Sequence, residues 1–253
     1  MADTIIRQAL DDSRVKALHE KVASQISLHF ESTEDKNWGA SVEGAEATIS
    51  YGPTTVPGAA LAHELFHVDL QLQGYQRPRA FISTIASPPV FKALMDALDN
   101  EFQHRRFYDQ YLELGFEPEF FYADDDVTAS AAFRKFLALP NQSRIARSLI
   151  YLGVSAPGGK ITSDEQRELR LACDAVDDGA HAGSWAALDD CFERWKKASA
   201  FDSRQYLKEI LLALAPDTEQ KPHRTWYTFS REPAVTIFPK GGEFVSREFD
   251  WKP

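Results

Sequence analysis

Three residues of the stretch 61–75, LAHELFHVDLQLQGY, have the types and spacing that metal-assisted hydrolysis needs. His63, Glu64 and His67 follow the order H-E-x-x-H. On a helix the two imidazoles project from one face, a turn apart, and both can reach a Zn²⁺ ion at about 2.0–2.1 Å. Glu64 lies beside the ion, where its carboxylate can take a proton from the attacking water. That chemistry is the hydrolysis of an amide.

The residues around the motif favour a metal over an accidental pattern. Apolar Leu61, Leu65 and Val68 surround the three polar side chains, as in a buried helix. Burying three polar groups without partners would cost several kcal/mol. We therefore interpret the motif as a zinc site with one ion per chain, rather than as a merely structural site.

The third ligand is predicted on the next long helix, in DNEFQHRRFYDQY (99–111). Glu101 would complete a two-His-one-Glu site in which water keeps the fourth position open. His104 lies three residues later on the same helix face. It is the alternative third ligand, a residue supporting the ligands, or a donor to the developing oxyanion. For Glu101 alone, a solvated helix carboxylate remains an alternative.

Two helices must position these residues. A helix over about 57–73 begins at Pro57, whose missing N–H has no partner in a first turn, and ends before Gly74. A second helix over about 91–114 is closed by Gly115. The alternation of apolar residues predicts strands at 25–32 and 44–52 before the motif.

The remaining elements follow from apolar periodicity and from turn residues. Residues 5–23 are expected to form one amphipathic helix, 33–44 a polar turn or irregular hairpin, and 76–90 a proline-interrupted connection. The last forty residues favour a small hairpin or three-stranded sheet. Further helices are predicted at 126–139, 142–153, 163–177, 184–199 and 203–214.

The order His63-Glu64-Leu65-Phe66-His67, followed downstream by Asn100-Glu101, resembles the gluzincin group of zinc metallopeptidases. The resemblance covers about residues 44–115. It implies His63, His67 and Glu101 as ligands, Glu64 as general base, and an edge strand, EATISYG, that pairs with the substrate backbone. Thermolysin-like members carry an aspartate four residues after the ligand glutamate, and Arg105 stands there in this chain.

We accordingly expect a mainly helical α+β fold. A zincin-like core, made of a small sheet, the HExxH helix and a second ligand helix, would occupy residues 1–155. A helical segment with a terminal β-hairpin or sheet would follow over 156–253. The function this predicts is a zinc metallopeptidase (a hydrolase) with Glu64 as base and His104 as a further catalytic candidate, acting on a peptide or protein.

The amino-acid composition excludes some classes of binding partner. The 253 residues carry a formal charge of −10, which would repel a nucleic-acid backbone or an anionic membrane surface. The sequence contains no run of about 18–20 apolar residues, the length that a membrane-spanning helix needs. Cys173 and Cys191 lie far apart and are expected to be buried thiols. These features predict a cytoplasmic protein that binds neither nucleic acid nor a membrane.

Two other classes of function remain open. One is a regulatory or interaction protein whose metal site is structural or vestigial. The other is a carboxylate-bridged di-iron protein, because Glu64–His67 and Glu101–His104 are both E-x-x-H units. Such bundles place a whole glutamate-bearing helix between the units, and the prolines in 76–90 oppose a helix there.

Overall fold

The computed structural model is a mainly helical α+β fold. It describes residues 2–34, 37–83, 86–122, 138, 144–158, 161–176, 183–214, 224–229 and 248–250. These residues form two compact units, described separately below. The first unit consists of Met1–Tyr75, Arg106–Val127 and Pro157–Lys160, and the second of Gln76–Arg105, Thr128–Ala156 and Ile161–Pro253. The predicted domain boundary near residue 155 stays a prediction.

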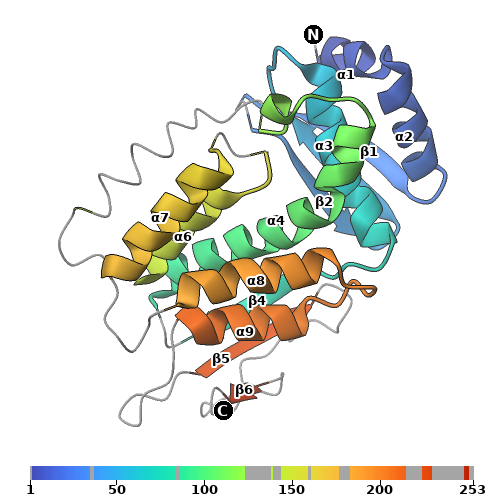
Figure 1. The fold of residues 1–253 in the computed structure, drawn as a ribbon. Coiled ribbons are helices and arrows are strands. Elements are labelled where there is room, and N and C mark those ends of the chain that lie inside the picture. The colour runs from blue at the N-terminus through green and yellow to red at the C-terminus, as the bar shows by residue number, and fades with distance from the viewer. Residues whose placement is uncertain are drawn as a thin grey trace. The chain divides into compact units, whose positions relative to one another are not determined.

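In the first unit, helices surround the helix that carries the motif (Figure 1). Helices α1 and α2 and strand β2 all pack against α3. The bounds are α1 Ala2–Leu10, α2 Ser13–Ala23, β1 Ser27–Ser32, β2 Gly39–Glu43, β3 Glu46–Tyr51, α3 Pro57–Leu72 and the 3₁₀-helix η1 Pro118–Phe120.

The single helix predicted over 5–23 is wrong, because the chain breaks into α1 and α2. Asp12 caps the second helix, its carboxylate accepting a hydrogen bond of 2.9 Å from the backbone N–H of Arg14. Aspartate at this position satisfies an otherwise unpaired donor of the first turn. The apolar periodicity continues across the break, which is why the sequence pattern did not show it.

The first sheet has the order β1-β3-β2. Strand β1 pairs with β3 in parallel, from Ser27 opposite Glu46 to Ser32 opposite Tyr51. Strand β2, in the segment predicted as a turn or irregular hairpin, pairs with β3 antiparallel. The prediction that EATISYG is an edge strand is therefore wrong, since β3 is the central strand with a partner on each side. Ala47, Ile49 and Tyr51 point into the core, as their alternation predicted.

The motif helix and the following long helix agree closely with the prediction. Helix α3 begins at Pro57, and Gly74 just beyond its end has φ +112°, a conformation that side chains disfavour. Helix α4, Pro88–Glu113, ends before Gly115, which has φ +84°. Helix α4 runs without interruption through the division between the units at Arg105 and Arg106.

The second unit contains the larger part of α4, further helices and a second sheet. In Figure 1 helices α8 and α9 lie side by side. The bounds are β4 Pro78–Ser83, α6 Arg144–Ser155, α7 Ser163–Val176, α8 Ser184–Lys196, α9 Arg204–Leu214, β5 Arg224–Phe229 and β6 Glu248–Asp250. The helices predicted over 142–153, 163–177, 184–199 and 203–214 are thus confirmed, and that over 126–139 lies outside the described residues.

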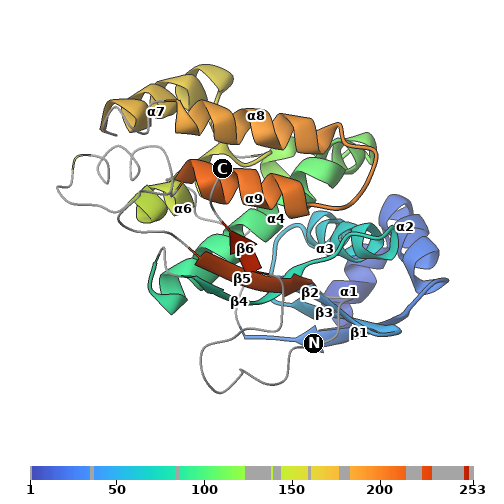
Figure 2. The same cartoon turned by 90° about the horizontal axis from the view of Figure 1, so that it is seen from below.

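The second sheet has the order β4-β5-β6, with both pairings antiparallel. Figure 2 shows β5 between the other two strands. Two strands of the hairpin or sheet predicted within the last forty residues are present, β5 and β6, and residues 230–247 of that prediction lie outside the described residues. The third strand is β4, from the segment expected to be only a connection. Pro78 is the first residue of β4, a position that proline tolerates in a strand, and Pro88 is the first residue of α4.

The core of the second unit is aromatic. The Trp195 side chain of α8 is fully buried, and its indole N–H donates a hydrogen bond of 2.7 Å to the backbone carbonyl of Phe102 in α4. The ring of Trp195 also meets the ring of Phe102 edge-on at 5.5 Å between centroids. This contact fixes α8 against the part of α4 that carries Glu101 and His104.

Cys173 and Cys191 are buried thiols, as expected. Among the described residues no helix has the length and apolarity to cross a membrane.

Candidate metal centre

The two histidines of the motif face each other on α3. Their Nε2 atoms are 3.1 Å apart, and both side chains are buried. Two nitrogens that bind one tetrahedral zinc ion at about 2.0–2.1 Å are separated by about 3.3 Å. The observed spacing is therefore close to that of a zinc pair, and an ion would need only a small opening of the two rings.

His104 of α4 completes a group of three. One ligand atom from each of His63, His67 and His104 lies within 4.8 Å of the others, and all three residues are buried. His104 is two residues before the part of α4 that belongs to the first unit, and the helix is continuous at that point. The described residues therefore contain a buried cluster of three imidazoles that could hold a metal ion.

The electrostatics suit neutral imidazole ligands. Burial, together with the neighbouring His67, lowers the pKa of His63 well below its usual value of 6.5. The nearby backbone of Phe121 opposes this decrease only in part. A neutral ring has the free lone pair that a metal requires.

An aromatic wall surrounds the motif histidines in the first unit. The centroid of the His63 ring is 4.5 Å from that of Phe121 and 5.5 Å from that of Phe107. Phe107 also meets His67 edge-on at 4.9 Å. Such a shell lowers the local dielectric and keeps water away from the imidazoles. Sequence reasoning missed both phenylalanines, although the aromatic run in FEPEFFY (116–122) was a visible signal for Phe121.

Phe121 is itself held in place by a glycine. A Cβ atom on Gly158 would lie 2.8 Å from the Cβ of Phe121, and Gly158 has φ +75°. Only glycine allows both the close approach and this backbone conformation. Gly158 thus supports the ring that packs on His63, from a position far along the chain.

Glu64 is also buried, with 6% of its surface exposed. It follows His63 directly on α3, as the motif requires. Its assignment as general base stays a prediction.

Glu101, predicted as the third ligand, is not one of the three grouped residues. It is buried, and its Oε2 lies 3.3 Å from Nε of Arg105, one turn further along α4. Its Oε1 is 3.9 Å from Nδ1 of His104. Burial raises the pKa of the Glu101 carboxyl to about 7, and Arg105 opposes this increase. The structure thus places His104, the predicted alternative, with the motif histidines, and places Glu101 beside His104.

Arg105 occupies the position where the thermolysin-like pattern has an aspartate. Its Nη2 donates a hydrogen bond of 3.0 Å to the carbonyl of Ser155 at the end of α6. Its guanidinium also lies over the ring of Phe192, 4.6 Å from the centroid. Arg105 therefore joins α4 to its neighbours in the second unit and holds the Glu101 carboxylate.

Comparison of the chain with models of known protein families, with curated proteins and with solved structures gave no match. The resemblance to gluzincins is therefore supported only by the buried three-histidine cluster, which could hold a metal. No similar protein supports it.

Proposed function

We propose that this protein is a zinc-dependent peptidase in which His63, His67 and His104 hold one Zn²⁺ ion and Glu64 is the general base. The observation that carries the proposal is the gathering of three buried imidazoles around the H-E-x-x-H order of α3. Catalytic zinc sites keep three protein ligands and leave one position for water or substrate. A closed structural site would use a fourth protein ligand.

The choice of His104 as third ligand gives Glu101 a different role. With Nδ1 of His104 facing the Glu101 carboxylate, Nε2 is the nitrogen left for the ion. The two atoms are 3.9 Å apart, longer than a hydrogen bond, and a small shift of either side chain on metal binding would let the carboxylate accept from the outer nitrogen, orient the ring and increase its basicity. Arg105 in turn holds the carboxylate. Glu101 is then a positioning residue and not a ligand.

These assignments give each group a role in the proposed reaction. Bound zinc would supply a water of lowered pKa and polarise the carbonyl of the scissile bond. The Glu64 carboxylate would take the proton from the attacking water and deliver it to the leaving amine. The Phe107 and Phe121 rings would exclude bulk water from this exchange.

A peptide is the favoured substrate class because the H-E-x-x-H order on a helix is typical of metalloproteases, in which the glutamate is the general base for hydrolysis of an amide.

The experiment has two parts. Purified protein reconstituted with zinc is expected to hold about one equivalent by elemental analysis. The loaded protein should then cleave members of a random peptide mixture, as followed by mass spectrometry. Glu64→Gln is expected to keep the zinc while cleavage falls by at least about a hundredfold, because it loses the general base. Less than half an equivalent of zinc in the wild type would overturn the proposal.

One observation favours a second candidate. The three histidines and Glu64 are all buried, as in a site that only stabilises a fold. A regulatory protein with a structural metal site would bind zinc and leave every peptide intact. Its function would be insensitive to Glu64→Gln, whereas a peptidase would lose turnover. The di-iron alternative finds no support, since strand β4 lies between the two E-x-x-H units where that architecture needs a helix.

A further inference from the structure

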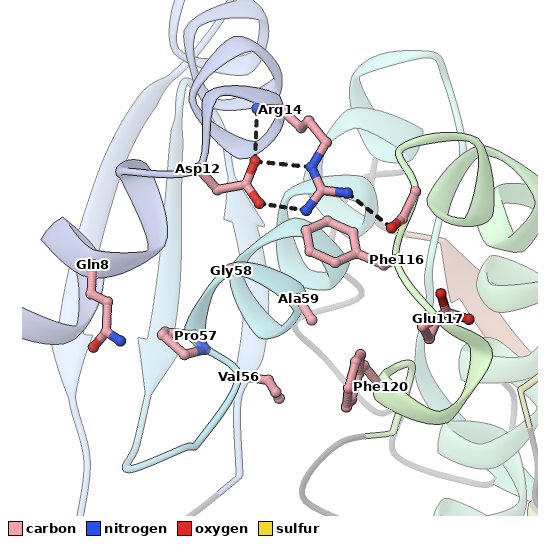
Figure 3. Close-up of a pocket in the computed structure, with 11 residues that line it drawn as sticks. Gln8, Asp12, Arg14, Val56, Pro57, Gly58, Ala59, Phe116, Glu117 and Phe120 are labelled. Carbon is pink, nitrogen blue, oxygen red and sulfur yellow. Dashed lines mark hydrogen bonds and ion pairs between the residues drawn. The ribbon is translucent and has the colours of Figure 1, made fainter.

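A cavity of about 330 Å³ opens at the N-terminal end of α3, inside the first unit (Figure 3). Its walls come from the α1–α2 junction, from the start of α3 and from the segment that follows α4. Apolar side chains in the wall come from Val56, Pro57, Ala59, Phe116 and Phe120. The volume is at the small end of the range of about 300–1,000 Å³ that ligand pockets occupy.

Two of the charged groups in the wall, Arg14 and Asp12, form an ion pair with each other. Nη2 of Arg14 lies 2.6 Å from Oδ2 of Asp12, and Nη1 of Arg14 donates to the carbonyls of Leu114 and Gly115 at 2.8 and 2.9 Å. The guanidinium also lies over the Phe116 ring, 4.4 Å from its centroid. Figure 3 shows Arg14 and Asp12 directed toward each other. An ionic ligand would have to break this pair, whereas an apolar ligand would not.

An anion is disfavoured for two further reasons. The residue at the first position of α3 is Pro57, which has no N–H to donate. Glu117, an exposed carboxylate, lies on the wall opposite the helix end and would repel a second negative charge. The positive end of the helix dipole therefore faces a wall that does not complement an anion.

The part of α3 that lines the cavity ends one helical turn before the motif. Ala59 precedes His63 by four residues on α3, which places it about 6 Å along the helix axis on the same face. Phe120 in the cavity wall precedes Phe121, whose ring packs on His63. A group that fills the cavity is thus one helical turn from the residue that begins the motif.

We infer that this cavity is the subsite that selects a large apolar side chain of the peptide substrate, of the size of leucine, methionine or phenylalanine. The inference rests on the proposed peptidase function and names its substrate class. Burying one such side chain favours binding by about tenfold to a hundredfold over alanine at the same position.

The test separates binding from cleavage. The zinc-loaded Glu64→Gln protein is immobilised and exposed to a random heptapeptide mixture, and the retained peptides are sequenced by mass spectrometry. We expect at least about tenfold enrichment of large apolar residues at one position. Enrichment of acidic residues there, or no enrichment at any position, would overturn the inference.

Two variants of the cavity make the result specific. Val56→Phe narrows the cavity and should shift the preference to alanine and valine. Phe120→Ala widens it and should favour tryptophan. Val176→Phe places the same new ring on exposed α7 and should change nothing. Zinc content and the melting temperature of each variant report whether it is folded. An unchanged preference in both folded cavity variants would refute the assignment.

The same assay, repeated on active protein, distinguishes the two proposals. Selective binding without any cleavage would overturn the peptidase and leave the cavity as an apolar binding site. Cleavage with no apolar preference would overturn the subsite and leave the peptidase.

Discussion

Zinc should stabilise the metal-free protein strongly, because the ligands are already close to their bound positions. The Nε2 atoms of His63 and His67 are 3.1 Å apart, against about 3.3 Å around a tetrahedral zinc ion, so little rearrangement opposes binding. A ligand at a thousand times its Kd, bound only by the folded state, adds about 4 kcal/mol to the free energy of unfolding. For a chain of this size that corresponds to an increase in Tm of about 8–16 °C.

Two substitutions on α4 should reduce this zinc-dependent increase in stability by different amounts. His104→Ala removes a ligand, and the zinc-dependent increase in Tm should nearly vanish. Glu101→Gln removes only the group that orients His104, and such residues contribute about 10–100-fold to metal affinity. That loss is about 1.4–2.7 kcal/mol, so between a third and two thirds of the gain should remain. His29→Ala, on the exposed side of β1, is the matched control and should keep the full gain.

The measurement is thermal unfolding followed by circular dichroism, for each protein after chelation and after addition of zinc. Equal zinc-dependent gains in His104→Ala and in the wild type would refute His104 as a ligand. A complete loss in Glu101→Gln with full retention in His104→Ala would restore Glu101 as the third ligand. No gain in the folded wild type would refute the metal site altogether.

Three further substitutions test the packing around the site. Trp195→Phe should decrease the free energy of unfolding by about 1–3 kcal/mol in urea titrations, because the indole hydrogen bond to Phe102 is lost; an unchanged midpoint would contradict this. Gly158→Ala should cost at least about 1–2 kcal/mol and lower the zinc affinity, since its Cβ would displace Phe121. Gly153→Ala, inside α6 with open space around a new Cβ, should instead stabilise by about 0.5–1 kcal/mol, and destabilisation would contradict the helix assignment.

The helices were predictable because their signals are local. Pro57 and Gly74 mark the ends of α3, and Gly115 follows the end of α4. The break after α1 was missed because a single capping aspartate, Asp12, interrupts an apolar period that continues on both sides. A helix cap changes the backbone within a single turn. Apolar periodicity is read over many residues and does not detect so short an interruption.

The strands were predicted less well because their partners are distant in sequence. The alternation of Ala47, Ile49 and Tyr51 indicated a half-buried strand but not its neighbours. Its central place depends on β1 and β2 both reaching it, one in parallel and one antiparallel. Strand β4 pairs with β5, more than a hundred residues later, and no local pattern carries that information.

By itself the sequence determined that His63, Glu64 and His67 share one buried helix, because four residues make about one turn and Pro57 and Gly74 mark the ends of the helix. It also limited the third ligand to Glu101 or His104, which lie one turn apart on α4. Only the tertiary structure placed the His104 imidazole, and not the Glu101 carboxylate, with the motif histidines. That choice depends on the rotation of α4 about its axis, which is set by side-chain packing along the whole helix.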